Sequence, residues 1–188
     1  MFGFVSTRDR RRVTTNTAIV GDSITVLIQH ELRHQLGTRY NADVRARNGA
    51  RIDEMLEPLR TMLRNNPRDV VVNLGTNDAL EAATRPAWQP GFAAMVDALT
   101  REDCVVFVNI NTEMRQGAAS DRAAIDINTA LDRVVRTHPN MHVIDWKGMV
   151  RQPAGDALLQ ADRIHPSSKG QEVLTTSIRR ALDTDCRG

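Results

Sequence analysis

Hydrophobic residues recur along the chain with two spacings that alternate from one end to the other. Short runs rich in Val and Ile have the length of buried strands, and they lie at 17–20, 43–46, 70–74, 104–110 and 141–144, the second being the weakest. Between them the apolar positions follow a helical period, which predicts helices at 24–36, 52–65, 92–100, 123–137 and 168–182. This alternation predicts an α/β fold, a five-stranded parallel sheet covered by helices on both faces in a three-layer α/β/α arrangement.

The same pattern predicts a single domain over residues 17–188, because no repeat, low-complexity tract or linker interrupts it. Residues 1–16 precede the first strand and contain a cluster of arginines at positions 8 and 10–12. We expect this segment to be a flexible, solvated N-terminal leader, since a short isolated charge run usually has no partner.

Charge and hydropathy exclude several classes of protein. The net charge is +2, from 25 basic and 23 acidic residues, so we expect no nucleic-acid partner. No apolar stretch approaches the length of a membrane span, and residues 1–17 lack the apolar core of a signal peptide. The default expectation is a cytoplasmic protein without a membrane span, and the oligomeric state stays open.

Polar residues follow the predicted strands at their carboxyl ends, where ligands bind in parallel α/β sheets. In chain order they are Gly21, Asp22 and Ser23, then Asn48, Gly49 and Ala50, then Gly75, Thr76, Asn77 and Asp78, then Asn111, Thr112 and Glu113, and finally Asp162, His165 and Pro166 on a longer loop. Groups of the kinds used in acyl transfer are therefore expected to converge on one edge of the sheet.

Ser23 and His165 are the candidate nucleophile and base. A serine hydroxyl is a weak nucleophile until a base takes its proton, and Asp162 could hold the imidazole in the tautomer that does so. Ser23 also falls at the start of a helix, where free N–H groups favour an oxyanion. The alternatives are that Ser23 only caps this helix, and that Asp162 only caps the last helix beside an ordinary loop histidine.

Two further groups complete the candidate site. The backbone N–H groups of Ser23 and Gly49 and the side-chain amide of Asn77 could form an oxyanion hole for a tetrahedral intermediate. Otherwise Gly49 is a turn glycine and Asn77 belongs to a polar turn. Residues predicted to contact the substrate or border its pocket are Asp22, Arg51, Glu113 and Met114, and the last three could equally be exposed loop residues.

Together these positions resemble the four sequence blocks of the SGNH (GDSL-like) hydrolases, in their usual order. The matching residues are Gly21 to Ser23, Gly49, Gly75 to Asp78, and Asp162 to Pro166. The resemblance implies a flavodoxin-like fold, a catalytic triad of Ser23, His165 and Asp162, and an oxyanion hole of Ser23, Gly49 and Asn77. It implies an esterase that hydrolyses carboxylic esters through an acyl-enzyme, without a metal ion or cofactor.

The expected substrate is a short acyl ester, such as an acetyl ester, of a small molecule or carbohydrate. Aromatic residues are only 4% of the chain and no insertion is long enough for a lid, which indicates a shallow site. The segment that starts at Asn128, with Asp145 and Trp146, also resembles SGNH domains related to peptidoglycan and polysaccharide O-acetyltransferases. Because the chain has no membrane acyltransferase part, transfer to a cell-wall sugar or polysaccharide is the alternative to hydrolysis.

Three rival functions use parts of the same sequence. His30, Glu31 and His34 spell the H-E-x-x-H zinc-protease motif, but apolar positions 24, 27, 28, 32 and 36 form one arc that leaves both histidines facing solvent. A metal phosphoesterase would need a denser ligand set than Asp22, Asn77, Asp78 and His165. A catalytically inactive binding module on the same fold is the third possibility.

The two cysteines are predicted to form a disulfide. Cys104 opens the fourth strand, at the end of the sheet opposite the site, and the last helix runs back toward that end with Cys186. The alternative is a pair of unrelated thiols. A disulfide would favour an exported protein over a cytoplasmic one.

Overall fold

Five parallel strands form the centre of the computed structural model, which describes residues 14–85 and 87–187. They are β1 (Thr15–Gly21), β2 (Tyr40–Ala46), β3 (Asp69–Asn73), β4 (Cys104–Val108) and β5 (Met141–Ile144). Their order in the sheet is β2-β1-β3-β4-β5, and every neighbouring pair is parallel. The predicted α/β fold with a five-stranded parallel sheet is therefore confirmed.

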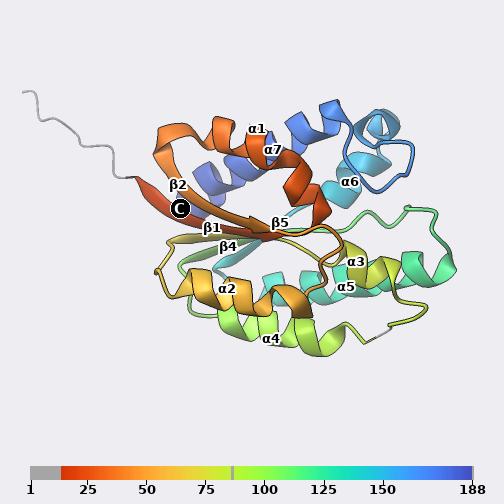
Figure 1. Ribbon diagram of the computed structural model, residues 1–188, viewed down its shortest axis with the longest axis horizontal. Coiled ribbons are helices and arrows are strands. Elements are labelled where there is room, and N and C mark those ends of the chain that lie inside the picture. The colour runs from red at the N-terminus through yellow and green to blue at the C-terminus, as the bar shows by residue number, and fades with distance from the viewer. Residues whose placement is uncertain (1–13, 86, 188) are drawn as a thin grey trace, which may run out of the picture.

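Helices cover both faces of this sheet, so the predicted three-layer arrangement is confirmed as well (Figure 1). One face carries α1 (Ser23–Leu36), α6 (Trp146–Arg151) and α7 (Ser168–Thr184). The other carries α2 (Leu56–Leu63), α3 (Thr76–Leu80), α4 (Gln89–Leu99) and α5 (Ala118–Thr137). Short 3₁₀ helices complete the described elements: η1 (Gly37–Arg39), η2 (Asp53–Met55), η3 (Gly155–Leu158) and η4 (Asp185–Arg187).

The side chains of the central strands alternate between two hydrophobic cores. In β3, Val70 and Val72 pack toward α2, α4 and α5, whereas Val71 packs toward α1 and α7. All residues of β3 are buried, as expected for a strand covered on both faces. The edge strand β2 is fully buried only at Tyr40, which explains why its hydrophobic pattern is the weakest of the five.

Several element boundaries differ from the predicted ones for local reasons. β4 ends before Ile110 because the Asn128 side chain takes over both backbone groups of that residue, at 2.9 and 2.8 Å. Neither α3 nor α6 was expected, since helices of five and six residues are too short to show a period. β1 starts at Thr15, so residues 15 and 16 belong to the sheet, while 1–13 of the expected leader lie outside the described residues.

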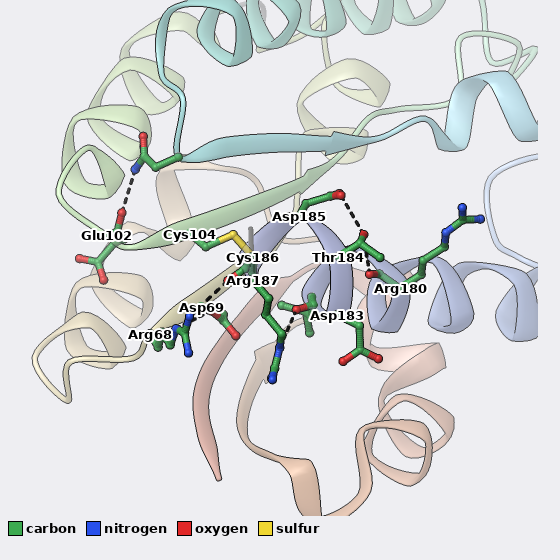
Figure 2. Close-up of a disulfide and its surroundings, with 12 residues drawn as sticks. Arg68, Asp69, Glu102, Cys104, Arg180, Asp183, Thr184, Asp185, Cys186 and Arg187 are labelled. Carbon is green, nitrogen blue, oxygen red and sulfur yellow. Dashed lines mark hydrogen bonds and ion pairs between the residues drawn. A yellow bond between two sulfur atoms is a disulfide. The ribbon is translucent and has the colours of Figure 1, made fainter. Parts of the chain in front are cut away.

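At the amino-end edge of the sheet, Cys186 in η4 forms a disulfide with Cys104 at the start of β4 (Figure 2). Their Cα atoms are 5.3 Å apart, and both side chains are buried. The predicted disulfide is confirmed, because α7 returns from the opposite edge and delivers η4 next to β4. Over the ranges 14–85 and 87–187, no helix is both long and apolar enough to cross a membrane.

Candidate active site

The turn between β1 and α1 presents the Ser23 hydroxyl at the carboxyl edge of the sheet. Asp22 is fully buried, and its Oδ1 accepts a hydrogen bond from the backbone N–H of Ile24 at 2.9 Å. Asp22 is thus the N-cap of α1, and the alternative that Ser23 serves only as the cap is wrong. Gly21 is required at this turn because a Cβ atom there would overlap the side chain of Thr25.

His165 connects Ser23 to Asp162 through its two ring nitrogens. Its Nε2 lies 3.0 Å from the Ser23 Oγ, and its Nδ1 lies 2.6 Å from the Asp162 Oδ2. With the Nδ1 proton directed at the carboxylate, Nε2 is left as an acceptor for the serine hydroxyl, a tautomer assigned from these contacts. Ser167 caps α7 instead of Asp162, so the capping alternative for Asp162 is also wrong.

The Asp162 carboxylate accepts hydrogen bonds on both oxygens. Its Oδ1 accepts from the backbone N–H groups of Ile164 and His165, at 2.9 and 3.0 Å, while Oδ2 faces the imidazole. Partial burial raises the pKa of Asp162, but the hydrogen bond from the His165 side chain and the two backbone N–H groups outweigh it, and the pKa lies below its ordinary value. Asp162 is therefore a carboxylate at neutral pH.

Gly49 and Asn77 follow β2 and β3, the two strands that flank β1. Gly49 adopts a φ of +71° in the turn after β2, a conformation that favours glycine. The Asn77 side chain donates to the carbonyl of Ala50 at 3.0 Å, which ties α3 to that turn and leaves one amide hydrogen free. Within the described residues, the backbone N–H groups of Ser23 and Gly49 have no acceptor. These donors match the expected oxyanion hole in kind.

The chain matches the sequence model of the GDSL-like lipase/acylhydrolase family over residues 19–173. This chain belongs to that family. The resemblance to the SGNH (GDSL-like) hydrolases is thereby confirmed, and the protein is an esterase-type enzyme. None of the curated proteins matches it in sequence.

Solved structures share the fold over nearly the whole chain. The catalytic domain of peptidoglycan O-acetyltransferase A from Streptococcus pneumoniae is 16% identical, with a TM-score of 0.74 and coverage of 92% of this chain and 94% of that one. A lipase/acylhydrolase from Enterococcus faecalis is 20% identical (TM-score 0.69; 90% and 95% covered). A mutant acetylxylan esterase from Geobacillus stearothermophilus is 13% identical (TM-score 0.70; 90% and 95%). Likeness at these identities concerns the fold.

Arg51 follows the turn of Gly49 in this GDSL-like enzyme, and its side chain is only 2% exposed. Its guanidinium is 3.4 Å from Asp78 and also pairs with Glu81 and Asp53. Asp78 in turn accepts from the backbone N–H of Ile52 at 3.0 Å, and burial raises its pKa. The structure therefore directs Arg51 toward the buried Asp78 and two more exposed carboxylates instead of an open substrate pocket.

The other residues expected around the substrate have different exposures. Asp22 has one carboxylate oxygen without a partner in the described part of the chain, and burial raises its pKa to about 7. Met114 is buried and lines an enclosed cavity of about 10 Å³ with Ile24, Asn73, Thr76, Asn109, Ile110, Asn111, Trp146 and Ile164. Glu113 is exposed, forms an ion pair with Arg151 at 3.1 Å, and borders an open groove of about 420 Å³.

The H-E-x-x-H sequence lies on the outer surface of α1, away from the candidate site. Both His30 and His34 are exposed, as the helical arc predicts. Leu27, which was expected in the buried arc, is 39% exposed because it lies at the margin of that arc. Among the residues that the structure describes, no three His, Cys, Asp or Glu side chains gather as metal ligands.

Sequence reasoning missed the supporting roles of several residues around the site. Asn111, Gln116 and Arg163 hold the loop of His165, and the Arg51–Asp78 pair supports the turn of Gly49. All of them are polar residues in loops or short helices, where no period distinguishes a buried side chain from an exposed one.

Proposed function

We propose that this enzyme is a serine hydrolase that cleaves short-chain carboxylic esters, with acetyl esters preferred, through Ser23, His165 and Asp162. The observation that carries the proposal is the unbroken hydrogen-bond chain from the Ser23 Oγ through both nitrogens of His165 to Asp162, at 3.0 and 2.6 Å. A nucleophile, a base and a group that orients the base are the requirements for acyl transfer through a covalent intermediate.

In this mechanism His165 Nε2 takes the Ser23 proton as Oγ attacks the ester carbonyl carbon. The carbonyl oxygen becomes negative, and the N–H groups of Ser23 and Gly49 and the free amide hydrogen of Asn77 donate to it. Collapse of the intermediate breaks the bond to the alcohol, whose oxygen takes the proton from His165. Water then attacks the acyl-enzyme by the same steps, and Asp162 stabilises each imidazolium.

The size of the acyl group is inferred from the small cavity beside the site. Ile24, Thr76 and Ile164, which line it, are chain neighbours of Ser23, Asn77 and His165. A volume of about 10 Å³ is the threshold for a single water molecule, so the cavity leaves no room for a long acyl chain. The cavity therefore offers a long acyl chain no place to bind, which supports a short acyl group.

Acyl transfer to a sugar hydroxyl is the second candidate function. The open groove next to Glu113 is lined largely by polar and charged side chains, among them Thr112, Thr129 and Lys147. Such a groove suits a bulky hydroxylated alcohol, either as the leaving group of hydrolysis or as the acceptor of a transfer. The sugar substrates of the O-acetyltransferase and acetylxylan esterase neighbours are of this kind.

A series of p-nitrophenyl esters from acetate to palmitate tests the proposal, alongside acetylated xylan and acetylated peptidoglycan. We expect kcat/KM to be highest for acetate and to fall with chain length. Transfer to added sugar acceptors faster than release of free acetate would favour the acyltransferase. A preference for palmitate would contradict the inferred acyl size.

The disulfide supports one cellular location over another. Disulfides persist in oxidising compartments and are rare in the cytosol, so the Cys104–Cys186 bond supports an exported enzyme over the cytoplasmic default. Extracellular or periplasmic location also suits an enzyme that acts on polysaccharide esters.

A further inference from the structure

The loop that carries His165 contains a residue in an unusual backbone conformation. Arg163, between Asp162 and His165, has a φ of +59°, in the left-handed region that favours glycine. This conformation turns the chain tightly enough for the Asp162 Oδ1 to accept from two successive backbone N–H groups while Oδ2 reaches the imidazole. Glycine would adopt this conformation more readily, which suggests that the Arg163 side chain has a role of its own.

The Arg163 side chain connects the loop to two other segments of the molecule. Its Nε donates to the carbonyl of Glu113 at 3.2 Å, in the loop between β4 and α5. Its Nη1 donates to the Asp156 carboxylate at 2.8 Å, in η3. The Arg163 side chain is only 17% exposed, whereas that of Asp156 is 76% exposed, so the guanidinium packs against the protein while its ion pair lies at the surface.

Two backbone carbonyls of the His165 loop also accept hydrogen bonds from the loop between β4 and α5. The carbonyl of Arg163 accepts from the Nδ2 of Asn111 at 2.9 Å, and Asn111 is buried. The carbonyl of Asp162 accepts from the Nε2 of Gln116 at 3.2 Å. Two side chains of the loop between β4 and α5, Asn111 and Gln116, therefore hold the His165 loop. Arg163 reaches in the opposite direction, and it is the one that also reaches η3.

We propose that Arg163 is a positioning residue for the Ser23–His165–Asp162 triad, an inference that rests on the function proposed above. Its guanidinium holds the loop in the conformation in which the Asp162 carboxylate meets His165 and His165 meets Ser23. Arg163 touches none of the reacting atoms. It acts by keeping the triad aligned at the distances that proton transfer requires.

The chain offers a matched control for this proposal. Arg115 also has a left-handed φ, of +58°, but its side chain is exposed and makes no hydrogen bond or ion pair within the described residues. Arg163→Gly and Arg115→Gly therefore make the same substitution in the same backbone conformation. Only Arg163→Gly removes tethers from the loop, and neither change introduces backbone strain.

We expect Arg163→Gly to lower kcat for p-nitrophenyl acetate by about 10- to 100-fold with little change in KM, the cost of a misplaced catalytic group. Arg115→Gly is expected to match the wild type. Guanidinium chloride at millimolar concentration should restore part of kcat in Arg163→Gly, because the free ion can bridge the Glu113 carbonyl and Asp156, and should leave the other two proteins unchanged. Arg163→Lys, which lacks the fork of donors, should stay impaired.

Wild-type kcat in Arg163→Gly would overturn the proposal. So would a loss that Arg115→Gly shares, or a loss that follows a lowered melting temperature and does not respond to guanidinium. Ser23→Ala, measured in parallel, separates this result from the proposed function. If Ser23→Ala is inactive while Arg163→Gly is fully active, only the positioning role fails, whereas an active Ser23→Ala removes the triad itself.

Discussion

The two ends of the sheet are held together by different kinds of contact. At the amino end the Cys104–Cys186 disulfide joins the last helical segment to β4, a covalent link between residues 82 positions apart (Figure 2). At the carboxyl end, the loops of the site are joined by hydrogen bonds such as that from Asn77 to Ala50 and by ion pairs such as Arg51–Asp78. The strongest crosslink of the described chain thus lies opposite the candidate site, which separates stability from activity.

Each end also buries a carboxylate that has an oxygen without a partner in the described residues. Burial raises the pKa of Asp22, next to Ser23, to about 7, and that of Asp69, at the start of β3, to about 6. Both groups therefore destabilise the folded protein when they are charged. The two ends differ in what lies near the buried carboxylate: the proposed nucleophile Ser23 at the carboxyl end and the disulfide at the amino end.

The largest expected effect of any single change is at the carboxyl end. Ser23→Ala should lower kcat/KM for p-nitrophenyl acetate by about 10⁴- to 10⁶-fold, as for loss of a triad member, and leave the melting temperature almost unchanged. A serine-directed fluorophosphonate should label the wild type at Ser23 and fail to label the variant. Activity near the wild-type level in Ser23→Ala would mean that another residue is the nucleophile.

The reverse result is expected at the amino end. Replacing Cys104 and Cys186 together by Ser should lower the free energy of unfolding by up to ~4–5 kcal/mol, the chain-entropy value for a loop of 82 residues. At temperatures where the variant stays folded, kcat/KM should equal that of the wild type. Urea denaturation and ester hydrolysis measure the two quantities, and a drop in activity without a drop in stability would contradict the separation.

The sequence predicts most of this architecture because the periods of its apolar residues are long and regular. In Val70 to Leu74 and in the helical pattern of 123–137, for example, the spacing of apolar residues indicates whether one or both faces of the element are buried. The candidate triad could be found for a related reason, since strand ends in a parallel sheet converge wherever the strands lie. The direction of α7 placed Cys186 at the same end of the sheet as Cys104, but it did not fix the lateral distance between them, which the structure supplies.

Contacts that depend on the conformation of loops could not be predicted in this way. Arg51 and Met114 were expected at the surface of the site, yet tertiary packing buries both. No pattern marks Asp78 as the partner of Arg51, or Arg163 as a left-handed residue tied to Asp156. Such positions are decided by side chains from three or more segments at once, and a periodic pattern describes one segment at a time.

Asn77→Ala should have an intermediate effect on the carboxyl end. Loss of one oxyanion donor typically lowers kcat by about 10²- to 10³-fold, and we expect KM to change far less because the donor is needed mainly when charge develops. The variant also loses the bond to Ala50, so its melting temperature is measured alongside kcat to separate loss of the oxyanion donor from displacement of the turn. An effect confined to KM would assign Asn77 to substrate binding.

The smallest expected effects are on the pH dependence of stability, and they distinguish the two buried carboxylates. A carboxyl group whose pKa is raised on folding binds more protons in the folded state, so the free energy of unfolding falls as pH rises from the unfolded pKa to the folded one. For Asp22 this window runs from 3.8 to about 7, and for Asp69 from 3.8 to about 6. Above its window each group contributes a constant penalty.

Asp22→Asn should therefore abolish the fall in the free energy of unfolding between pH 6 and 7, whereas Asp69→Asn should retain it. Asparagine is as good an N-cap as aspartate, so the bond to the Ile24 N–H is retained while the buried charge is lost. Between pH 6 and 8, the free energy of unfolding of Asp22→Asn relative to the wild type should rise by about 1–2 kcal/mol, since one pKa unit corresponds to about 1.4 kcal/mol. The same difference for Asp69→Asn should change little over that range. Urea denaturation at several pH values measures both, with the exposed Asp97→Asn as a control that should follow the wild type. Equal slopes for Asp22→Asn and the control would mean that the charge beside Ser23 is compensated, and that the two ends of the sheet do not differ in this respect.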